Sequence, residues 1–403
     1  LKPGTTTGEW VSSILFAVVV ATIVHAYVIQ PFTIPTSSLE KTLLVGDFLF
    51  VSKFHYGART PMTPISFPMV HDTIPVIKTK SYVSKPQLPY LRLPGFQEIK
   101  RNDIVVFNWP VDTVRQFFDR SGIHYYKPID KKSNYVKRAV GIPGDSIEIK
   151  DGYVFVNGLK NELPDRAKLQ FAYIVRVNAP IDPQLLINRY NITDHIEYRD
   201  GTYFFAGVSD EALKMLQNNP NVVEIQRFKQ EEGQRDQRIF PYAPQYPWNN
   251  DNMGPVYIPK KGATVKIDSE SIPFYKRIIE VYEGSELGID NTITQNGTEV
   301  LLNGNPITEY TFKMDYYWMM GDNRNNSEDA RTWGYVPYNH VVGKPVFVWM
   351  SWDGINKKVR WDRVFTTVGG SGKPKSYLTY FLIALAAYFV FDYFRKKKRK
   401  EAS

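Results

Sequence analysis

Serine and lysine are the residues in this sequence whose types and settings could carry nucleophilic chemistry. Thr36, Ser37 and Ser38 follow a proline and precede an apolar run, which predicts an exposed polar turn. Lys137 lies in the apolar segment YVKRAVG. A serine hydroxyl becomes nucleophilic when a base takes its proton, and a lysine can be that base only if its pKa falls from about 10.4. Residue chemistry alone does not choose between Ser37 and Ser38.

Other common catalytic arrangements have no signature here. The chain has no cysteine, which excludes disulfides and thiolate metal sites. The HExxH, GxSxG and GxxxxGK[ST] motifs are absent, which removes the usual zinc, serine hydrolase and NTPase interpretations. The histidines form no i,i+4 pair and are scattered at His25, His55, His71, His124, His195 and His340. We therefore expect neither a metal nor a cofactor.

Each segment also has an ordinary structural interpretation when it is taken alone. Thr-Ser-Ser clusters usually cap turns, and a lone lysine in a strand usually extends its ammonium to water. A third segment, residues 319–337, is dense in Gly, Asp and Asn and predicts a structured loop. An ion pair between Asp329 and Arg331 would cross-link that loop.

Together and in this order, the three segments resemble the signature boxes of the bacterial type I signal peptidases, also called leader peptidases. That family has a serine shortly after a transmembrane helix, a lysine in a KRAVGxPGD segment and a late GDNRxNSxDSRxWG loop. The matching residues here are 34–53, 137–145 and 321–334, with a fourth similar piece, NDIVVFNWP, at 102–110. Close resemblance covers less than a quarter of the chain. It implies a membrane-bound serine endopeptidase that removes signal peptides from exported preproteins, cutting after small residues in an Ala-x-Ala-like pattern.

The resemblance also implies a role for individual residues. The family's nucleophile falls on Ser38 and its general base on Lys137. Its oxyanion hole corresponds to the Ser38 backbone N–H and the Thr36 hydroxyl, and its lysine-orienting serine to Ser327. The positions that line its shallow substrate pocket are Ile34, Pro35, Leu39, Leu43, Tyr135 and Val136. Its structural acid-base pair corresponds to Asp329 and Arg331.

Two residues depart from the family pattern. Leu39 stands where the family usually has a methionine, and Lys41 stands where it usually has a proline. These departures bear on the shape of the pocket more than on activity.

Two apolar stretches have the length and composition of membrane spans. Residues 11–29 carry no charge, and residues 377–394 are aromatic at both ends. A cleaved secretory signal or a buried core helix is the alternative for the first stretch, but only Lys2 precedes it where a signal would carry a basic region. The chain begins at Leu1 rather than Met, which leaves open whether residues precede it.

The charge pattern predicts a topology. The chain has 50 Lys and Arg against 41 Asp and Glu, and residues 395–400 are all basic. By the positive-inside rule this tail is cytoplasmic. Two crossings then place residues 31–373 on the extracytoplasmic, periplasmic face of a bacterial inner membrane. Because the basic excess is concentrated in the tail, we expect no nucleic-acid partner.

The body of the chain reads as mainly β. Short runs with a period of two occur at 103–109, 145–158, 298–304 and 344–352, which predicts strands. Helical signals are confined to the middle, where Ser209 could cap a helix. The expected fold is therefore a β-rich, signal-peptidase-like core with an inserted α+β domain, tethered by a helix at each end.

The expected divisions follow from these signals. They are a first span at 10–30, core at 31–158 with a proline-rich excursion at 58–100, an insert at 159–310, core at 311–373, a second span at 374–394 and a basic tail at 395–403. The insert carries no functional motif. It could shape the cleft, contact the export machinery or brace the fold.

Two other functions compete with the peptidase. One is a double-anchored envelope protein that binds extended peptides without cleaving them. The other is a self-cleaving Ser/Lys repressor, against which the absence of a helix-turn-helix segment and the presence of two spans argue. Signal peptides and the lipid bilayer remain the expected partners.

Overall fold

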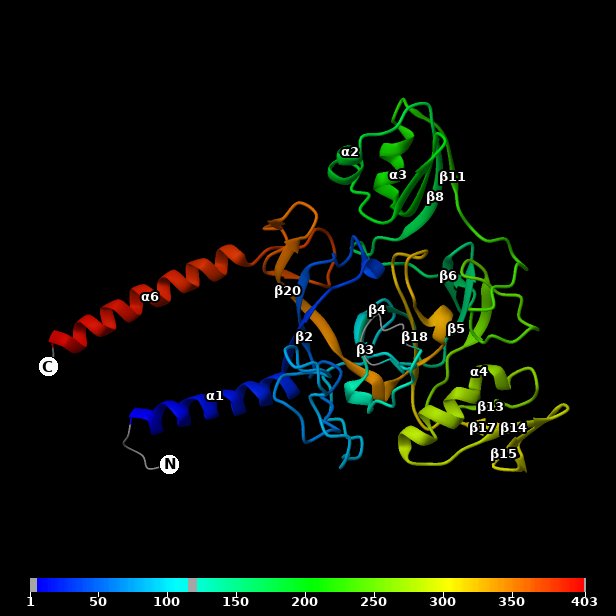
Figure 1. Cartoon of the computed structure of the whole chain (residues 1–403), viewed down its shortest axis with the longest axis horizontal. Coiled ribbons are helices and arrows are strands. Elements are labelled where there is room, and N and C mark those ends of the chain that lie inside the picture. The colour runs from blue at the N-terminus through cyan, green and yellow to red at the C-terminus, as the bar shows by residue number, and fades with distance from the viewer. Residues whose placement is uncertain (1–5, 115–121, 402–403) are drawn as a thin grey trace.

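A curled antiparallel sheet forms the centre of the computed structural model, which describes residues 6–114 and 122–401 (Figure 1). The strands lie in the order β1-β2-β20-β3-β4-β18-β19, with β21 and β22 paired to β20. This confirms the prediction of a mainly β body. The bounds are β1 Ile29–Thr33, β2 Asp47–Ser52, β3 Ile104–Asn108, β4 Asn134–Gly141, β18 Tyr316–Met320, β19 Val336–Pro337, β20 Val341–Asp353, β21 Lys358–Val359 and β22 Thr366–Thr367.

The sheet carries a hydrophobic core on each face, as the alternation of side chains along a strand requires. Val106 packs with Leu39 and Leu43 on one face. Its neighbour Val105 packs with Trp333 on the other. Because both faces are covered, the middle strands are apolar along almost their whole length, and a polar residue placed there is excluded from water.

A separate four-stranded sheet follows in the chain, in the order β11-β8-β10-β9. It packs with two short helices around its own core, which includes Phe205 and Leu216. Asp182 and Ser209 cap these helices through their side chains, so the helix predicted after Ser209 is confirmed. The bounds are β8 Gln170–Val177, α2 Pro183–Asn188, β9 Ile196–Arg199, β10 Thr202–Ser209, α3 Asp210–Gln217 and β11 Val222–Arg227.

The remaining strands form small sheets around another core on the opposite side of the body (Figure 1). The sequence-predicted insert at 159–310 thus contributes to more than one hydrophobic cluster. The bounds are β5 Ser146–Lys150, β6 Tyr153–Val156, β7 Leu159–Lys160, β12 Met253–Tyr257, β13 Thr264–Lys266, α4 Ile272–Arg277, β14 Ile293–Asn296, β15 Glu299–Leu302, β16 Asn305–Pro306, β17 Glu309–Thr311 and α5 Ala330–Trp333. Single-turn or irregular helices are Ser37–Leu39, Ile129–Lys131, Ile278–Tyr282, Ser285–Leu287 and Tyr338–His340.

Two long apolar helices, α1 (Thr6–Tyr27) and α6 (Leu378–Glu401), project from the same side of the body, and both chain ends lie at their far ends (Figure 1). Each contains a window long and apolar enough to cross a membrane, and no part of either window is buried in the protein. The helices overlap both predicted spans. Both candidate spans thus lie on one side of the body (Figure 1).

The proline-rich stretch predicted as irregular lies between β2 and β3 and has no regular helix or strand. Isolated bridges, such as Arg59 with Arg92, and backbone hydrogen bonds, such as that from the Leu93 N–H to the Ala58 carbonyl, hold it together. It lies beside the end of α1 (Figure 1).

Candidate active site

Ser38 and Lys137 meet in the interior although 99 positions separate them in the sequence. Ser38 lies in the single turn that follows β1, and Lys137 lies in the middle of β4, opposite Val105 of β3. The Lys137 Nζ donates a hydrogen bond of 2.6 Å to the Ser38 Oγ. Lys137 is 3% exposed and Ser38 is 8% exposed, so the pair is shielded from bulk water.

Burial determines the protonation of Lys137. Removing an ammonium from water disfavours its charged form, and this lowers the pKa of Lys137 to about 8. The carboxylates of Asp329 and Glu328 oppose that shift, and the guanidinium of Arg331 adds to it. A substantial fraction of the amine is therefore neutral near physiological pH, and a neutral amine beside a hydroxyl can accept its proton.

Two hydrogen-bond donors near the serine make no hydrogen bond with any residue that the structure describes. They are the Thr36 hydroxyl, which precedes the turn without capping it, and the backbone N–H of Ser38. Thr36 is only partly buried, so a ligand can reach it. Unused donors of this kind suit a site where negative charge develops on a bound carbonyl oxygen.

The late loop packs against this turn through its first residues. Asp322 forms a doubly hydrogen-bonded ion pair with Arg138 of β4, and its carboxylate also accepts from the Thr42 hydroxyl at 2.6 Å. The Asn323 backbone N–H donates to the Ser38 carbonyl at 3.1 Å. These contacts join the strand that holds Lys137 to the turn that holds Ser38.

The end of the late loop is fixed by a second buried ion pair. Asp329 accepts from Arg331 through both carboxylate oxygens at 2.9 Å, and it also caps α5. The Gly321 N–H donates to the same carboxylate. Because the pair is fully buried, removing one partner would leave an uncompensated charge.

Ser327 lies close to the Ser38 turn but makes no hydrogen bond with Ser38 or Lys137. Its Oγ is buried and has no hydrogen-bond partner among the described residues. The hydroxyl instead lies against Gly321, where an added Cβ would come within 2.2 Å of it. A hydrogen bond to the Lys137 amine is therefore absent from this conformation.

The predicted pocket residues divide by exposure. Leu39 and Leu43 are 2% and 1% exposed and belong to the core beneath the turn, together with Ile34. Pro35 is exposed. The remaining two, Tyr135 and Val136, are partly buried on β4. Pro35, Tyr135 and Val136 are thus the members of the predicted set whose side chains a substrate could reach.

Comparison with known proteins gives the family of the chain. The family model described as "Signal peptidase, peptidase S26" matches residues 7–352. The chain therefore belongs to the signal peptidase family. The protein is accordingly a serine peptidase of the bacterial signal peptidase I type.

Relatives named signal peptidase I share about a quarter of their residues with this chain. The protein from Helicobacter pylori is 26% identical over 379 residues, which cover 91% of this chain and 93% of that protein. The one from Rickettsia canadensis is 28% identical over 241 residues, covering 56% and 77%. The one from Buchnera aphidicola of Schizaphis graminum is 24% identical over 331 residues, covering 82% and 71%.

Sequence reasoning missed a contact between this signal peptidase site and the middle of the chain. The Asp194 carboxylate accepts from the side-chain amide of Asn323 at 2.6 Å and from that of Asn326 at 2.7 Å. Asn326 also donates to the Ser37 hydroxyl at 3.0 Å. No spacing rule connects Asp194 to the late loop, because the contact depends on how two distant segments dock.

The two departures from the family pattern lie at the same junction. Lys41 has a φ of +69°, which proline cannot adopt. Its ammonium donates to Asn191 and Thr193 at 3.0 and 2.8 Å. The departure at Lys41 thus coincides with a contact to the middle segment, and Leu39 remains a core residue.

The charged groups around the site offer no metal centre. Within residues 6–114 and 122–401, no group of three or more His, Cys, Asp or Glu side chains is arranged to hold a metal ion.

Proposed function

We propose that this signal peptidase removes signal peptides from exported preproteins with Ser38 as the nucleophile and Lys137 as the general base. The 2.6 Å contact between the Lys137 amine and the Ser38 hydroxyl, in a site closed to bulk water, is the observation that carries the proposal. The names of the relatives support the substrate class.

The proton moves between these two groups in both halves of the reaction. Neutral Lys137 takes the Ser38 proton as the serine oxygen attacks the scissile carbonyl carbon. The resulting ammonium then protonates the leaving amine, and the C–N bond breaks to give an acyl-serine. Lys137, neutral again, takes a proton from a water molecule as that water attacks the ester; the signal peptide then leaves with a new carboxyl terminus, and Lys137 returns the proton to the Ser38 oxygen.

The oxyanion of the tetrahedral intermediate would bind to the Ser38 N–H and the Thr36 hydroxyl. Neither donor is committed to another described residue, which supports this assignment. A donor of this kind typically stabilises the transition state by about 3 kcal/mol.

Ser327 would orient the lysine only after a side-chain rotation. Its hydroxyl lacks a hydrogen-bond partner among residues 6–114 and 122–401, and a buried unpaired hydroxyl is costly, so a rotation toward Lys137 would satisfy it. We propose that this rotation occurs when substrate binds. Asp329 and Arg331 would act only by holding the loop.

Cleavage after small residues in an Ala-x-Ala-like pattern is the specificity that we propose. A pocket with rigid apolar walls leaves little room for a large side chain of the substrate. Pro35, Tyr135 and Val136 would contact the substrate, and the core residues Ile34, Leu39 and Leu43 would keep this wall rigid.

Attachment to the membrane through both α1 and α6 is part of the proposal. The body would lie on the periplasmic face, close to signal peptides held in the inner membrane, with the basic tail in the cytoplasm. Residues 159–310 would form the inserted part between the two core segments, 31–158 and 311–373. Contact with the export machinery remains a prediction from the resemblance.

The cut site provides the direct test of this function. We expect the full-length enzyme in detergent to convert a model preprotein with an Ala-x-Ala site into two products whose masses place the cut after the second alanine. A matched preprotein with tyrosine at that alanine should be cut at least about 100-fold more slowly. A cut elsewhere, or equal rates, would contradict the proposed specificity.

A further prediction concerns Asp194 as a positioning residue. Asp194→Ala removes the acceptor shared by Asn323 and Asn326, so the turn that carries Ser38 should shift relative to Lys137. We expect kcat to fall roughly tenfold with KM changed less than twofold, because small misplacements of reacting groups are costly.

The control for Asp194 is Asp200→Ala, which removes an 89% exposed carboxylate in the turn between β9 and β10. Asp194→Asn, which keeps an acceptor oxygen, should recover part of kcat. Thermal unfolding distinguishes a positioning role from a loss of stability. We expect Asp194→Ala to have the melting temperature of the wild type and a lower kcat. An unchanged kcat in Asp194→Ala would refute the positioning role.

A further inference from the structure

A cavity of about 640 Å³ lies where α1 joins the body, away from the Ser38 turn. Its wall includes Thr22, His25 and Tyr27 from the last turns of α1 and Lys53 from just beyond β2. The proline-rich segment closes the other side. Because α1 is a candidate membrane span, this cavity opens beside the point at which the chain would leave the bilayer.

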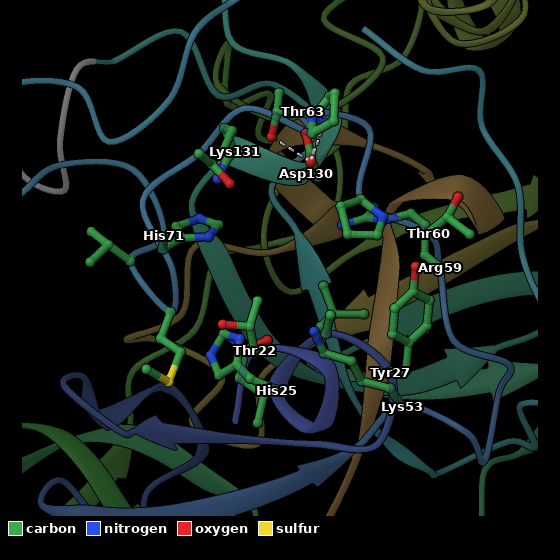
Figure 2. A pocket seen from close by; sticks show the side chains of 18 of the residues that line it. Thr22, His25, Tyr27, Lys53, Arg59, Thr60, Thr63, His71, Asp130 and Lys131 are labelled. Carbon is green, nitrogen blue, oxygen red and sulfur yellow. Dashed lines mark hydrogen bonds between the residues drawn. The ribbon is translucent and has the colours of Figure 1, made fainter. Parts of the chain in front are cut away.

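Positive charge predominates in the cavity. Its permanently or commonly charged lining residues are Lys53, Arg59 and Lys131, against the single carboxylate of Asp130. Figure 2 shows these side chains, with His25 and His71, arranged around one opening. An anion of more than one charge would therefore be attracted to it.

Two of these charges already have protein partners. The Asp130 Oδ2 accepts from the backbone N–H groups of Met62 and Thr63 and from the Thr63 hydroxyl, although its Oδ1 is buried without a hydrogen-bond partner among the described residues. Arg59 donates to the Asn339 carbonyl and to the Asn108 side chain.

The two lysines are not paired in this way. Neither the Lys53 nor the Lys131 ammonium makes a hydrogen bond or an ion pair with any residue in 6–114 or 122–401. Lys131 is only 6% exposed, and its ammonium lies over the Tyr82 ring, 5.3 Å from the ring centroid. Burial lowers the pKa of Lys53 to about 7 and lowers that of Lys131. Lys131 is buried and Lys53 is partly buried, and the Asp130 carboxylate opposes the lowering of both pKa values without cancelling it, so this site would be stabilised by a further anion rather than a further cation.

The mouth of the cavity is apolar. Phe67, Met69, Leu88 and Leu91 line it and are each between 47% and 57% exposed. A small inorganic anion would leave these side chains in water. A molecule with an anionic head and hydrocarbon chains would cover both the lysines and this apolar mouth.

We propose that this cavity binds the phosphate of an anionic membrane phospholipid between Lys53 and Lys131, with the acyl chains lying over the apolar mouth and along α1. The bound lipid fixes the orientation of the body on the bilayer. The proposal rests on membrane attachment but is independent of the Ser38 and Lys137 chemistry.

Lipid binding to the full-length protein in detergent tests the proposal by native mass spectrometry. Phosphatidylglycerol and phosphatidylcholine with identical acyl chains are the two probes. We expect the wild type to retain phosphatidylglycerol at least about tenfold more tightly. The double variant Lys53→Gln/Lys131→Gln should lose most of that preference, because it removes both unpaired charges.

The matched control is Lys266→Gln/Lys276→Gln, which makes the same charge change at exposed positions in another part of the body. It should bind within twofold of wild type. Equal retention of phosphatidylglycerol by wild type and the cavity variant would overturn the proposal, as would equal affinity of the wild type for both lipids. Complete displacement of the lipid by an equal concentration of inorganic phosphate would also overturn it.

Preprotein cleavage in detergent separates this proposal from the proposed function. The cavity variant should cleave a model preprotein at the wild-type rate and unfold at the wild-type temperature. Lipid binding is measured by the mass of the adduct and does not depend on activity. A wild type that cleaves no preprotein but still prefers phosphatidylglycerol would therefore refute the peptidase assignment and leave the lipid site supported.

Discussion

Ser38→Ala is expected to reduce cleavage of a model preprotein by about 10⁴-fold or more, to the rate of the uncatalysed background. The variant lacks the oxygen that would form the acyl-enzyme, and no later step can replace it. The measurement is the rate of product formation by intact mass, with circular dichroism to verify folding. The loss should appear in kcat, since the substrate surface remains unchanged.

Ser37→Ala is the matched control, because residue chemistry alone could not distinguish these neighbours. The Ser37 hydroxyl accepts from the Asn326 side chain at 3.0 Å, whereas only the Ser38 hydroxyl accepts from Lys137. We expect Ser37→Ala to retain activity within about tenfold, the cost of one hydrogen bond. A dead Ser37→Ala with an active Ser38→Ala would overturn the assignment.

The same pair of variants addresses the competing peptide-binding function. A protein that only binds extended peptides would hold the preprotein equally well with or without the Ser38 hydroxyl and would yield no product. An acyl adduct of matching mass on the wild type, absent from Ser38→Ala, would exclude that function.

Local patterns in the sequence predicted most of the fold. The alternation of apolar residues in 145–158 became the β5 and β6 hairpin, and the acidic first turn after Ser209 became α3. Such features depend on residues within a few positions of one another, so periodicity and capping rules detect them. The exact helix ends differed by a few residues because terminal turns fray.

Long-range docking could not be predicted in the same way. The residues of the 159–310 segment pack into more than one cluster, and Asp194 reaches the late loop, because tertiary contacts leave no period in the sequence. Lys137 was singled out by its apolar neighbours, but only resemblance paired it with Ser38. The Ser327 hydroxyl has no hydrogen-bond partner in the part of the chain that the structure describes, which shows that a motif match does not specify a rotamer.

Lys137→Met should abolish activity to a similar extent as Ser38→Ala, since it fills the same buried space without a base. Lys137→Arg should also be inactive, because a guanidinium remains protonated at any pH in which the protein is folded. Recovery of more than a few per cent of the wild-type kcat by either variant would remove Lys137 as the base. The free energy of unfolding of Lys137→Met should not fall, because no buried charge is left unpaired.

The direction in which the kcat/KM of the wild type changes with pH identifies the base. Lys137 acts when neutral, so kcat/KM should rise with pH and reach half its plateau near pH 8, where the amine is half protonated. Below that point the rate should fall roughly tenfold per pH unit. Glu328 raises the pKa of Lys137 through its negative charge, so Glu328→Gln should move the rise to lower pH without lowering the plateau. A shift to higher pH would show that another group controls the reaction.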